Sequence, residues 1–224
     1  MLLFFLRELR ECLRALCAKR FFRNGQAREF ERLIPSSEMS RMPAHVRILC
    51  LGNELLADDA FGLAAAEELR RRFPQMDVVF TTDSGLHLLD YLEEIQLLIV
   101  VDSIQTGKVS PGTLYILRSS DMKSSYGPSP HYVGLLETLQ LAKELLLNVP
   151  KDVIILAVEA ADCLTLGGKM HDAVKMSVGL AVELVAEIAQ SCSALPAHQD
   201  SGDGLTRAIA TVSARWGSER LVVI

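Results

Sequence analysis

The 224-residue sequence lacks several motifs that identify common α/β enzymes. The first strand-like apolar segment ends at Gly52, but no GxGxxG follows it, which disfavours a dinucleotide site. Gly167-Gly168-Lys169 lacks the upstream glycine spacing and the Ser or Thr of a phosphate-binding P-loop. Neither HExxH nor GxSxG occurs. Nucleotide-dependent chemistry and the commonest zinc-protease and serine-hydrolase sites are therefore unsupported.

Paired cysteines are also missing. The five cysteines have no CxxC spacing and no regular interval; they are Cys12, Cys17, Cys50, Cys163 and Cys192. This distribution indicates neither a disulfide framework nor a zinc ribbon. We therefore expect a protein of a reducing cytoplasm.

Positive charge is scarce outside the N-terminal segment. Residues 35–224 contain fifteen Lys and Arg against twenty-four Asp and Glu, a net charge of −9, whereas residues 1–34 contain eight against four. We expect no nucleic-acid partner, because such a surface needs concentrated basic charge. We also expect no transmembrane span, because Arg7 and Glu8 interrupt the first apolar run before about 17 apolar residues accumulate.

Residues 1–45 form a basic, amphipathic extension. Its leucines recur near one face of a predicted helix, at Leu2, Leu6, Leu9, Leu13 and Leu16. Three interpretations stay open: a membrane-surface or partner helix, a targeting segment, or a stretch that the mature protein does not contain. Since Met42 stands just before the first predicted strand, we expect residues 1 to about 41 to be peripheral to function.

From residue 46 onward, short apolar segments alternate with helical patterns. This alternation predicts a three-layer α/β sandwich, in which helices flank a mostly parallel, twisted sheet of the phosphorylase/hydrolase-like kind. The domain is predicted over residues 46–190, followed by a linker and C-terminal tail over residues 191–224. The predicted strands are Val46–Leu51, Met76–Thr81, Leu97–Val101, Gly112–Leu117 and Asp152–Val158, with an antiparallel, hairpin-like strand at Gly112. The predicted helices are Asp59–Phe73, Leu86–Glu93, His131–Leu147 and Met170–Gln190.

Acidic residues follow three of the predicted strands. Asp59 follows the loop after the first strand, Asp83 follows the second and Asp102 follows the third. Because the carboxyl ends of parallel strands meet at one edge of a sheet, we expect these acids to converge. His131 opens a later helix, held by Pro130 near its N-terminus. Two carboxylates and an imidazole are typical of a divalent transition-metal site, with nickel, zinc and iron as candidates.

Each of these residues also has a purely structural interpretation. Asp58 or Asp59 could cap the helix that follows. Asp83, beside Ser84-Gly85, is more often a turn residue, and an aspartate at a strand end such as Asp102 often accepts backbone hydrogen bonds. A single histidine is more often structural than a ligand. Only the predicted convergence of these residues favours a metal site.

Four blocks in the order LGNELLADDAFG, TDSGLHLLDYL, VVDSIQTG and SPHYVGLLETL resemble the hydrogenase maturation endopeptidases. These enzymes trim the large subunit of nickel-iron hydrogenases, and the resemblance covers roughly Val46 to Ile188. It implies that Asp59, Asp102 and His131 are the metal-binding and catalytic residues. Asp58 is then expected to be a cap or a supporting group. Asn53 and Asp83 are expected near the cleft, where they would shape it or hydrogen-bond the ligands.

The resemblance implies a nickel-dependent endopeptidase, of the type classed as aspartyl, that removes the C-terminal extension of a large-subunit precursor after nickel insertion. The precursor itself supplies the nickel, and we expect a cytoplasmic monomer. Two other functions stay open: a noncatalytic, nickel-dependent binding factor for the precursor, and a metal-independent small-molecule enzyme on the same fold.

Two places depart from the family pattern. Ala60 stands where the family has glycine, a change that matters if the backbone there needs a positive φ. The late block reads AVEAADCLTLGG rather than the usual glycine-isoleucine-acid/amide-proline turn, which affects the late loop and any substrate specificity that it carries.

Overall fold

The computed structural model describes residues 45–92, 95–118, 130–150 and 152–193, with 206–207, 210–211, 214–215 and 221–223. All of them belong to one compact unit over residues 43–224. Nearly all of the predicted N-terminal extension, and most of the predicted linker and tail, lie outside the described residues. The predicted domain boundaries therefore stay predictions.

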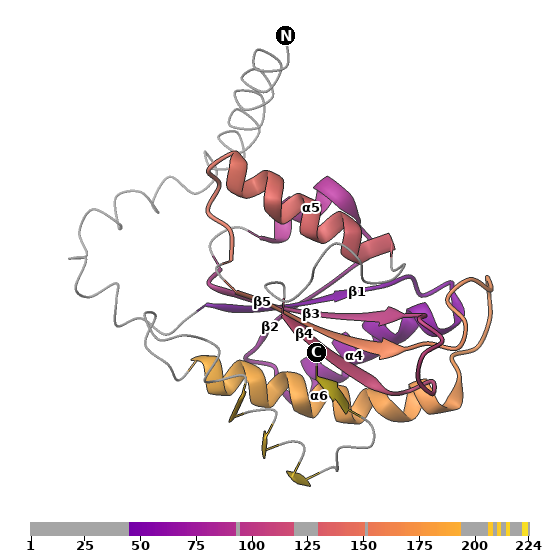
Figure 1. The fold of residues 1–224 in the computed structure, drawn as a ribbon. Helices are drawn as coiled ribbons and strands as arrows, with labels where there is room; N and C mark the ends of the chain where they lie inside the picture. The colour runs from indigo at the N-terminus through magenta and orange to yellow at the C-terminus, as the bar shows by residue number, and fades with distance from the viewer. Residues whose placement is uncertain are drawn as a thin grey trace. The chain divides into compact units, whose positions relative to one another are not determined.

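A mixed, six-stranded sheet in the order β2-β1-β3-β5-β4-β6 forms the centre of the described chain (Figure 1). β1, β2, β3 and β5 are parallel, β4 pairs antiparallel with β5, and β6 pairs parallel with β4. β4 corresponds to the hairpin-like strand expected at Gly112, and its antiparallel partner is β5. The strands are β1 (Val46–Leu51), β2 (Asp77–Thr81), β3 (Leu97–Ile104), β4 (Leu114–Arg118), β5 (Asp152–Glu159) and β6 (Leu221–Val223).

Helices cover both faces of this sheet, which confirms the predicted α/β fold class. α4 (Phe61–Arg72) and α6 (Asp172–Ser193) lie on one face, and η2 (Gly85–Tyr91) and α5 (Pro130–Glu144) on the other (Figure 1). Successive strand residues alternate between the two apolar layers, as strand geometry requires. Ile99 packs in the α4/α6 layer, whereas its neighbours Leu98 and Val100 pack in the α5/η2 layer. No helix in the described part of the chain is long and apolar enough to span a membrane.

The helix predicted over Asp59–Phe73 consists of two parts. A 3-10 turn, η1 (Ala57–Ala60), precedes α4, and neither element has a side-chain cap, because their N-cap residues are Leu56 and Ala60. The interpretation of Asp58 or Asp59 as a helix cap is therefore wrong: both carboxylates bond to other segments of the chain. The segment predicted as the helix Leu86–Glu93 is likewise the 3-10 helix η2.

β3 is longer than its apolar run predicts. It continues past Val101 to Ile104, so that Asp102 lies inside the strand rather than after it. All eight residues of β3 are buried, because β1 and β5 flank it and β5 pairs with it as far as Ile104 and Glu159. Pairing on a central strand therefore extends the strand into a polar stretch that the local pattern assigns to a loop.

The chain between β1 and α4 folds back tightly on itself. Gly52 has a φ of +149°, and a Cβ there would lie 2.1 Å from the Asp59 carbonyl oxygen. A Cβ on Gly62 would lie 1.9 Å from the Leu51 carbonyl oxygen. Both glycines are needed for this approach, which holds Asp59 against the end of β1. Ala60 has a φ of −67°, so alanine is accommodated where the family has glycine.

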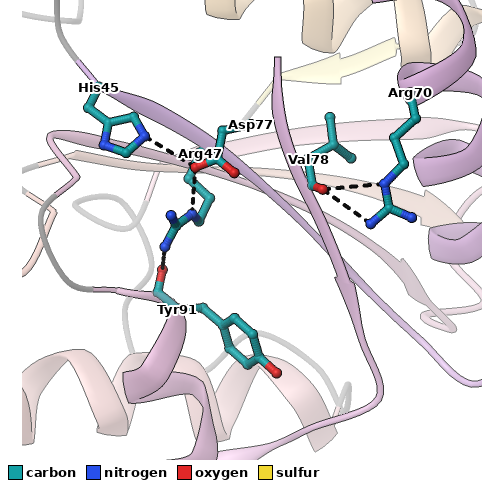
Figure 2. Close-up of polar contacts among 6 residues, drawn as sticks. All are labelled: His45, Arg47, Arg70, Asp77, Val78 and Tyr91. Carbon is teal, nitrogen blue, oxygen red and sulfur yellow. Dashed lines mark hydrogen bonds and ion pairs between the residues drawn. The ribbon is translucent and has the colours of Figure 1, made fainter. Parts of the chain in front are cut away.

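Charged side chains join the amino ends of β1 and β2 (Figure 2). The Arg47 Nε donates to Asp77 Oδ2 at 2.8 Å, and the His45 Nε2 lies 3.2 Å from the same oxygen. The Arg47 Nη1 also donates to the Tyr91 carbonyl oxygen at 3.2 Å, at the end of η2. This cluster links the first residues of the two strands to the α5/η2 layer.

Candidate active site

Buried polar side chains lie at the opposite, carboxyl edge of the sheet, among them Asp58, Asp59, Asp102 and Ser103. Asp58 and Asp59 belong to η1, which follows β1, and Asp102 and Ser103 belong to the last half of β3. Asp58 and Asp102 are fully buried, while Asp59 and Ser103 are 6% and 3% exposed. Polar groups at this edge of an open α/β sheet are positioned where such folds place their ligands.

Ser103 contacts both carboxylates that the sequence assigns to the site. Its Oγ donates to Asp59 Oδ1 at 2.7 Å, and its backbone N–H donates to Asp102 Oδ1 at 2.7 Å. The Cys163 Sγ lies 3.5 Å from the same Oγ. Asp59 therefore bonds to the residue that follows Asp102, even though the two aspartates come from different elements.

Strand alternation assigns Asp102 to the α5/η2 side of the sheet. Leu98, Val100 and Ile104 on β3 all pack in that layer, so Asp102 shares their face. The N-terminal part of α5 lies near this edge. A Cβ on Gly134, the fifth residue of α5, would lie 2.9 Å from the backbone nitrogen of Gly85, which follows β2. His131 belongs to the first turn of α5, but its side chain lies outside the described residues.

Asp58 bonds to a distant loop. Its Oδ2 accepts the backbone N–H groups of Ala161 and Asp162 at 2.8 and 3.0 Å. Its Oδ1 accepts the N–H of His171 at 2.6 Å. All three donors belong to the loop between β5 and α6. Asp58 therefore supports the site's surroundings, as one of its predicted roles required, through a loop more than 100 residues away in sequence.

The described part of the site is rich in carboxylates. Neither Asp58 nor Asp59 forms an ion pair with any of the residues that the structure describes. The pKa of the Cys163 thiol is raised to about 11, chiefly by burial and further by the carboxylates of Asp59, Asp58 and Asp102. Buried carboxylates that bond to neutral donors keep their field, which favours a cation at this edge.

The donor set suits a divalent metal ion. Carboxylate oxygens and imidazole nitrogens bind such ions, and Asp59 and Asp102 supply the carboxylates. Among the side chains described, no group of three His, Cys, Asp or Glu residues is arranged to hold a metal. The His131 side chain is not part of that set, so the predicted three-residue site stays a prediction.

Asp83 and Asn53 bond to their own turns. Asp83 Oδ2 accepts the Tyr91 hydroxyl at 2.7 Å, and this bond is the main cause of a lowered pKa of the Asp83 carboxyl. Asn53 Oδ1 accepts the N–H of Leu55 at 3.0 Å, while its backbone N–H donates to the Asp59 carbonyl oxygen at 3.2 Å. Asp83 thus bonds through its side chain to the end of η2, and Asn53 supports Asp59 through the backbone.

Two polar residues of this edge were missed by sequence reasoning. Ser103 directly follows Asp102, and Glu159 ends β5. Glu159 Oε1 accepts the N–H groups of Thr106 and Gly107 at 2.8 and 2.7 Å, and its Oε2 accepts the Tyr115 hydroxyl at 2.8 Å. The rule that selected the other acids, a carboxylate at a strand end, also applies to Glu159. It holds the loop after β3 and thus the end of the strand that carries Asp102.

Comparison with known proteins identifies relatives. A family model described as hydrogenase maturation protease matches residues 63–188, more than half of the chain. The hydrogenase expression/formation protein HupD of Bradyrhizobium diazoefficiens is 34% identical over 152 residues, which is 63% of this chain and 78% of that protein. HoxM of Cupriavidus necator, described in the same words, is 30% identical, over 65% of this chain and 74% of that protein.

Solved structures have the same fold. The hydrogenase maturating endopeptidase HybD from Escherichia coli is 27% identical with a TM-score of 0.56, covering 66% of this chain and 93% of that one. The [NiFe] hydrogenase maturation protease HybD from Thermococcus kodakarensis is 25% identical with a TM-score of 0.53, covering 65% and 99%. The similarity thus extends over nearly the whole length of both solved chains.

Proposed function

Because the chain belongs to the hydrogenase maturation proteases, and is therefore a peptidase, we propose that it removes the C-terminal extension of a nickel-iron hydrogenase large-subunit precursor after nickel insertion. The observation that carries this proposal is the pair of buried carboxylates, Asp59 and Asp102, around Ser103 at the carboxyl edge of the family's fold. A peptidase that recognises a metal-loaded precursor needs anionic ligands for that metal where the scissile segment is bound.

Asp59, Asp102 and His131 are the residues that would bind the nickel carried by the precursor. Asp59 supports this role because its field is not neutralised by any described cation, and because its Oδ1 is oriented by Ser103. Asp102 supports it because it faces the layer whose helix α5 carries His131 in its first turn. Two carboxylates and one imidazole leave coordination positions for ligands from the precursor.

Nickel brought by the precursor would supply either polarisation of the scissile carbonyl or activation of a bound water. The contribution of the chain itself is binding and orientation. A precursor without nickel presents nothing for Asp59 and Asp102 to bind, so its scissile bond is not held in a reactive position. The same three residues would then act as a checkpoint that delays cleavage until nickel has been inserted.

The test is an intact-mass measurement on a large-subunit precursor from the same genome, prepared with and without nickel and incubated with the full chain. The expected result is loss of the C-terminal extension from the nickel-loaded precursor only. Equal cleavage without nickel would contradict the nickel dependence. A stable complex with an unchanged precursor mass would favour the noncatalytic binding factor instead.

We also propose that this reaction takes place in the cytoplasm and that the chain acts as a monomer. The three cysteines within the described residues are free, as a reducing compartment favours; they are Cys50, Cys163 and Cys192. Light scattering coupled to size exclusion checks the oligomeric state. A dimer mass at micromolar concentration would contradict it.

A further inference from the structure

The loop that Asp58 holds, residues 160–171, runs along the segment 53–60 that carries Asp59. The N–H of Asp58 donates to the Asp162 carbonyl oxygen at 2.9 Å, and that of Gly167 donates to the Leu55 carbonyl oxygen at 2.8 Å. Leu56 and Leu166 form an antiparallel bridge between the two segments. The two segments are thus joined as a short ribbon beside the carboxyl edge of the sheet.

Asp58 is the strongest link in this ribbon. Its carboxylate is fully buried and accepts three backbone N–H groups, from Ala161, Asp162 and His171. Hydrogen bonds to an ionised acceptor are about twice as strong as those between neutral groups. Without this acceptor the three partly buried N–H groups would lose the one carboxylate that they share. The loop therefore depends on Asp58 for its position.

The same loop reaches the partner of Asp59. Cys163 follows directly after Asp162, and its Sγ lies 3.5 Å from Ser103 Oγ, the group that donates to Asp59 Oδ1. If this loop were displaced, the Ser103 hydroxyl would lose its contact with Cys163. Asp58 is also the immediate neighbour of Asp59 on η1, so its anchoring fixes the backbone from which the Asp59 carboxylate projects.

We propose that Asp58 is a positioning residue, which holds the loop 160–171 against the segment 53–60 and thereby orients Asp59 for cleavage of the precursor. This role rests on the proposed function. Asp58 touches neither the precursor nor its metal: it acts through the loop and through Asp59.

The first test replaces Asp58 by asparagine. Asp58→Asn keeps the size of the side chain but puts an amide NH2 where one oxygen now faces N–H donors. We expect amide hydrogen exchange of residues 161–171, measured without precursor, to become at least tenfold faster. We expect kcat for processing of the nickel-loaded precursor to fall at least tenfold, at a temperature where circular dichroism shows both proteins folded.

The second test restores the loop by another route. The bonds from Ala57 to Thr165 and from Gly167 to Leu55 make Leu56 and Leu166 a non-hydrogen-bonded pair, whose Cα atoms are typically about 4.5 Å apart. That spacing suits a disulfide. The triple variant D58N/L56C/L166C, oxidised and verified by peptide mapping, is expected to recover slow exchange and at least half of the normal kcat. Dithiothreitol should abolish both, and L56C/L166C with Asp58 intact is the matched control.

A variant of the loop itself tests the same link without touching Asp58. A Cβ on Gly168 would lie 2.9 Å from the Ala57 Cβ, so Gly168→Val pushes the two segments apart. We expect the same loosening of residues 161–171 and a loss of kcat of at least tenfold. This variant carries the test if Asp58→Asn does not fold.

Two results would overturn the positioning role. One is normal processing by Asp58→Asn or Gly168→Val while exchange of the loop is accelerated. The other is an oxidised triple variant with restored slow exchange but no restored processing, since Asp58 would then act on the precursor directly. If the unmodified chain does not process the precursor at all, the proposed function fails and the positioning role fails with it. Normal processing by the wild type and by Asp58→Asn alike overturns the positioning role alone.

Discussion

The charged residues at the two edges of the sheet differ in their bonding partners and in their burial. At the amino edge, Asp77 is paired with Arg47 and His45, and the side chains of Asp77 and Arg47 are 32% and 20% exposed (Figure 2). At the carboxyl edge, Asp58 and Asp59 are buried and bond to neutral N–H and O–H donors. The carboxylate at the amino edge therefore has basic partners, whereas Asp58 and Asp59 have none among the described residues.

This difference predicts that the charged groups at the amino edge contribute mainly to stability and those at the carboxyl edge mainly to binding. A partly exposed ion pair is screened by water and contributes at most about 1 kcal/mol to the free energy of unfolding. Here it mainly fixes how the amino ends of β1 and β2 pack together. A buried carboxylate held by neutral dipoles retains its field, and neither Asp58 nor Asp59 has an ion-pair partner within the described part of the chain. We therefore expect changes at the carboxyl edge to alter processing more than stability, and changes at the amino edge to do the reverse.

Loss of the proposed ligands is the largest expected effect. Asp59→Ala, Asp102→Ala and His131→Ala should each abolish processing, because each removes one ligand of the substrate's nickel. Intact mass of the precursor measures the loss, and thermal melting of each variant shows that the fold persists. Normal cleavage by any one of them would remove that residue from the site. Asp59→Glu should retain more activity than Asp59→Ala, since it keeps the carboxylate.

Loss of the Ser103 hydroxyl, which donates to Asp59, comes next. Ser103→Ala deletes the donor to Asp59 Oδ1 but leaves the backbone N–H that Asp102 accepts. We expect about a tenfold fall in kcat/KM, which is about 1.4 kcal/mol of transition-state stabilisation. Steady-state processing assays measure it, with Ser177→Ala as the matched control, because Ser177 is a buried serine whose hydroxyl donates to the Val174 carbonyl oxygen of its own helix, α6. Equal activity of the two variants would show that Asp59 needs no orientation by Ser103.

The amino edge should respond in the opposite way. Asp77→Ala removes the partner of both Arg47 and His45, and we expect the free energy of unfolding to fall by about 1 kcal/mol. Urea unfolding measures the change. Processing should stay at the wild-type rate, since no proposed ligand contacts this cluster. A loss of processing in folded protein would break the proposed separation between the two edges.

The smallest expected effect is a gain of stability beyond the end of α5. Leu146 has a φ of +57° and is 76% exposed, so leucine pays a backbone cost there with little burial in return. Leu146→Gly should relieve about 1–2 kcal/mol of left-handed strain, partly offset by the chain entropy of glycine. We expect a net gain of about 0.5 kcal/mol in urea unfolding and no change in processing. A destabilised variant would show that the leucine side chain packs more than its exposure indicates.

Most of the fold follows from local pattern. β1 has the predicted bounds, and β2, β4 and β5 differ from theirs by one or two residues, because short apolar runs between helical patterns are strong local information. The strand-end rule also located Asp59 and Asp102 at one edge. The separate interpretation of Asp58 or Asp59 as a helix cap was wrong, because the partners of these side chains lie in other segments.

By itself, the amino-acid sequence determined the α/β class, the presence of acidic residues near the carboxyl ends of parallel strands, and the family. Only the tertiary structure decided that β3 continues through Asp102 to Ile104, that the Ser103 hydroxyl donates to Asp59, and that Asp58 holds a loop 103 residues further along the chain. The physical reason is sequence separation. Apolar periodicity is a property of neighbouring residues, whereas a buried carboxylate takes whichever donors the folded chain brings to it.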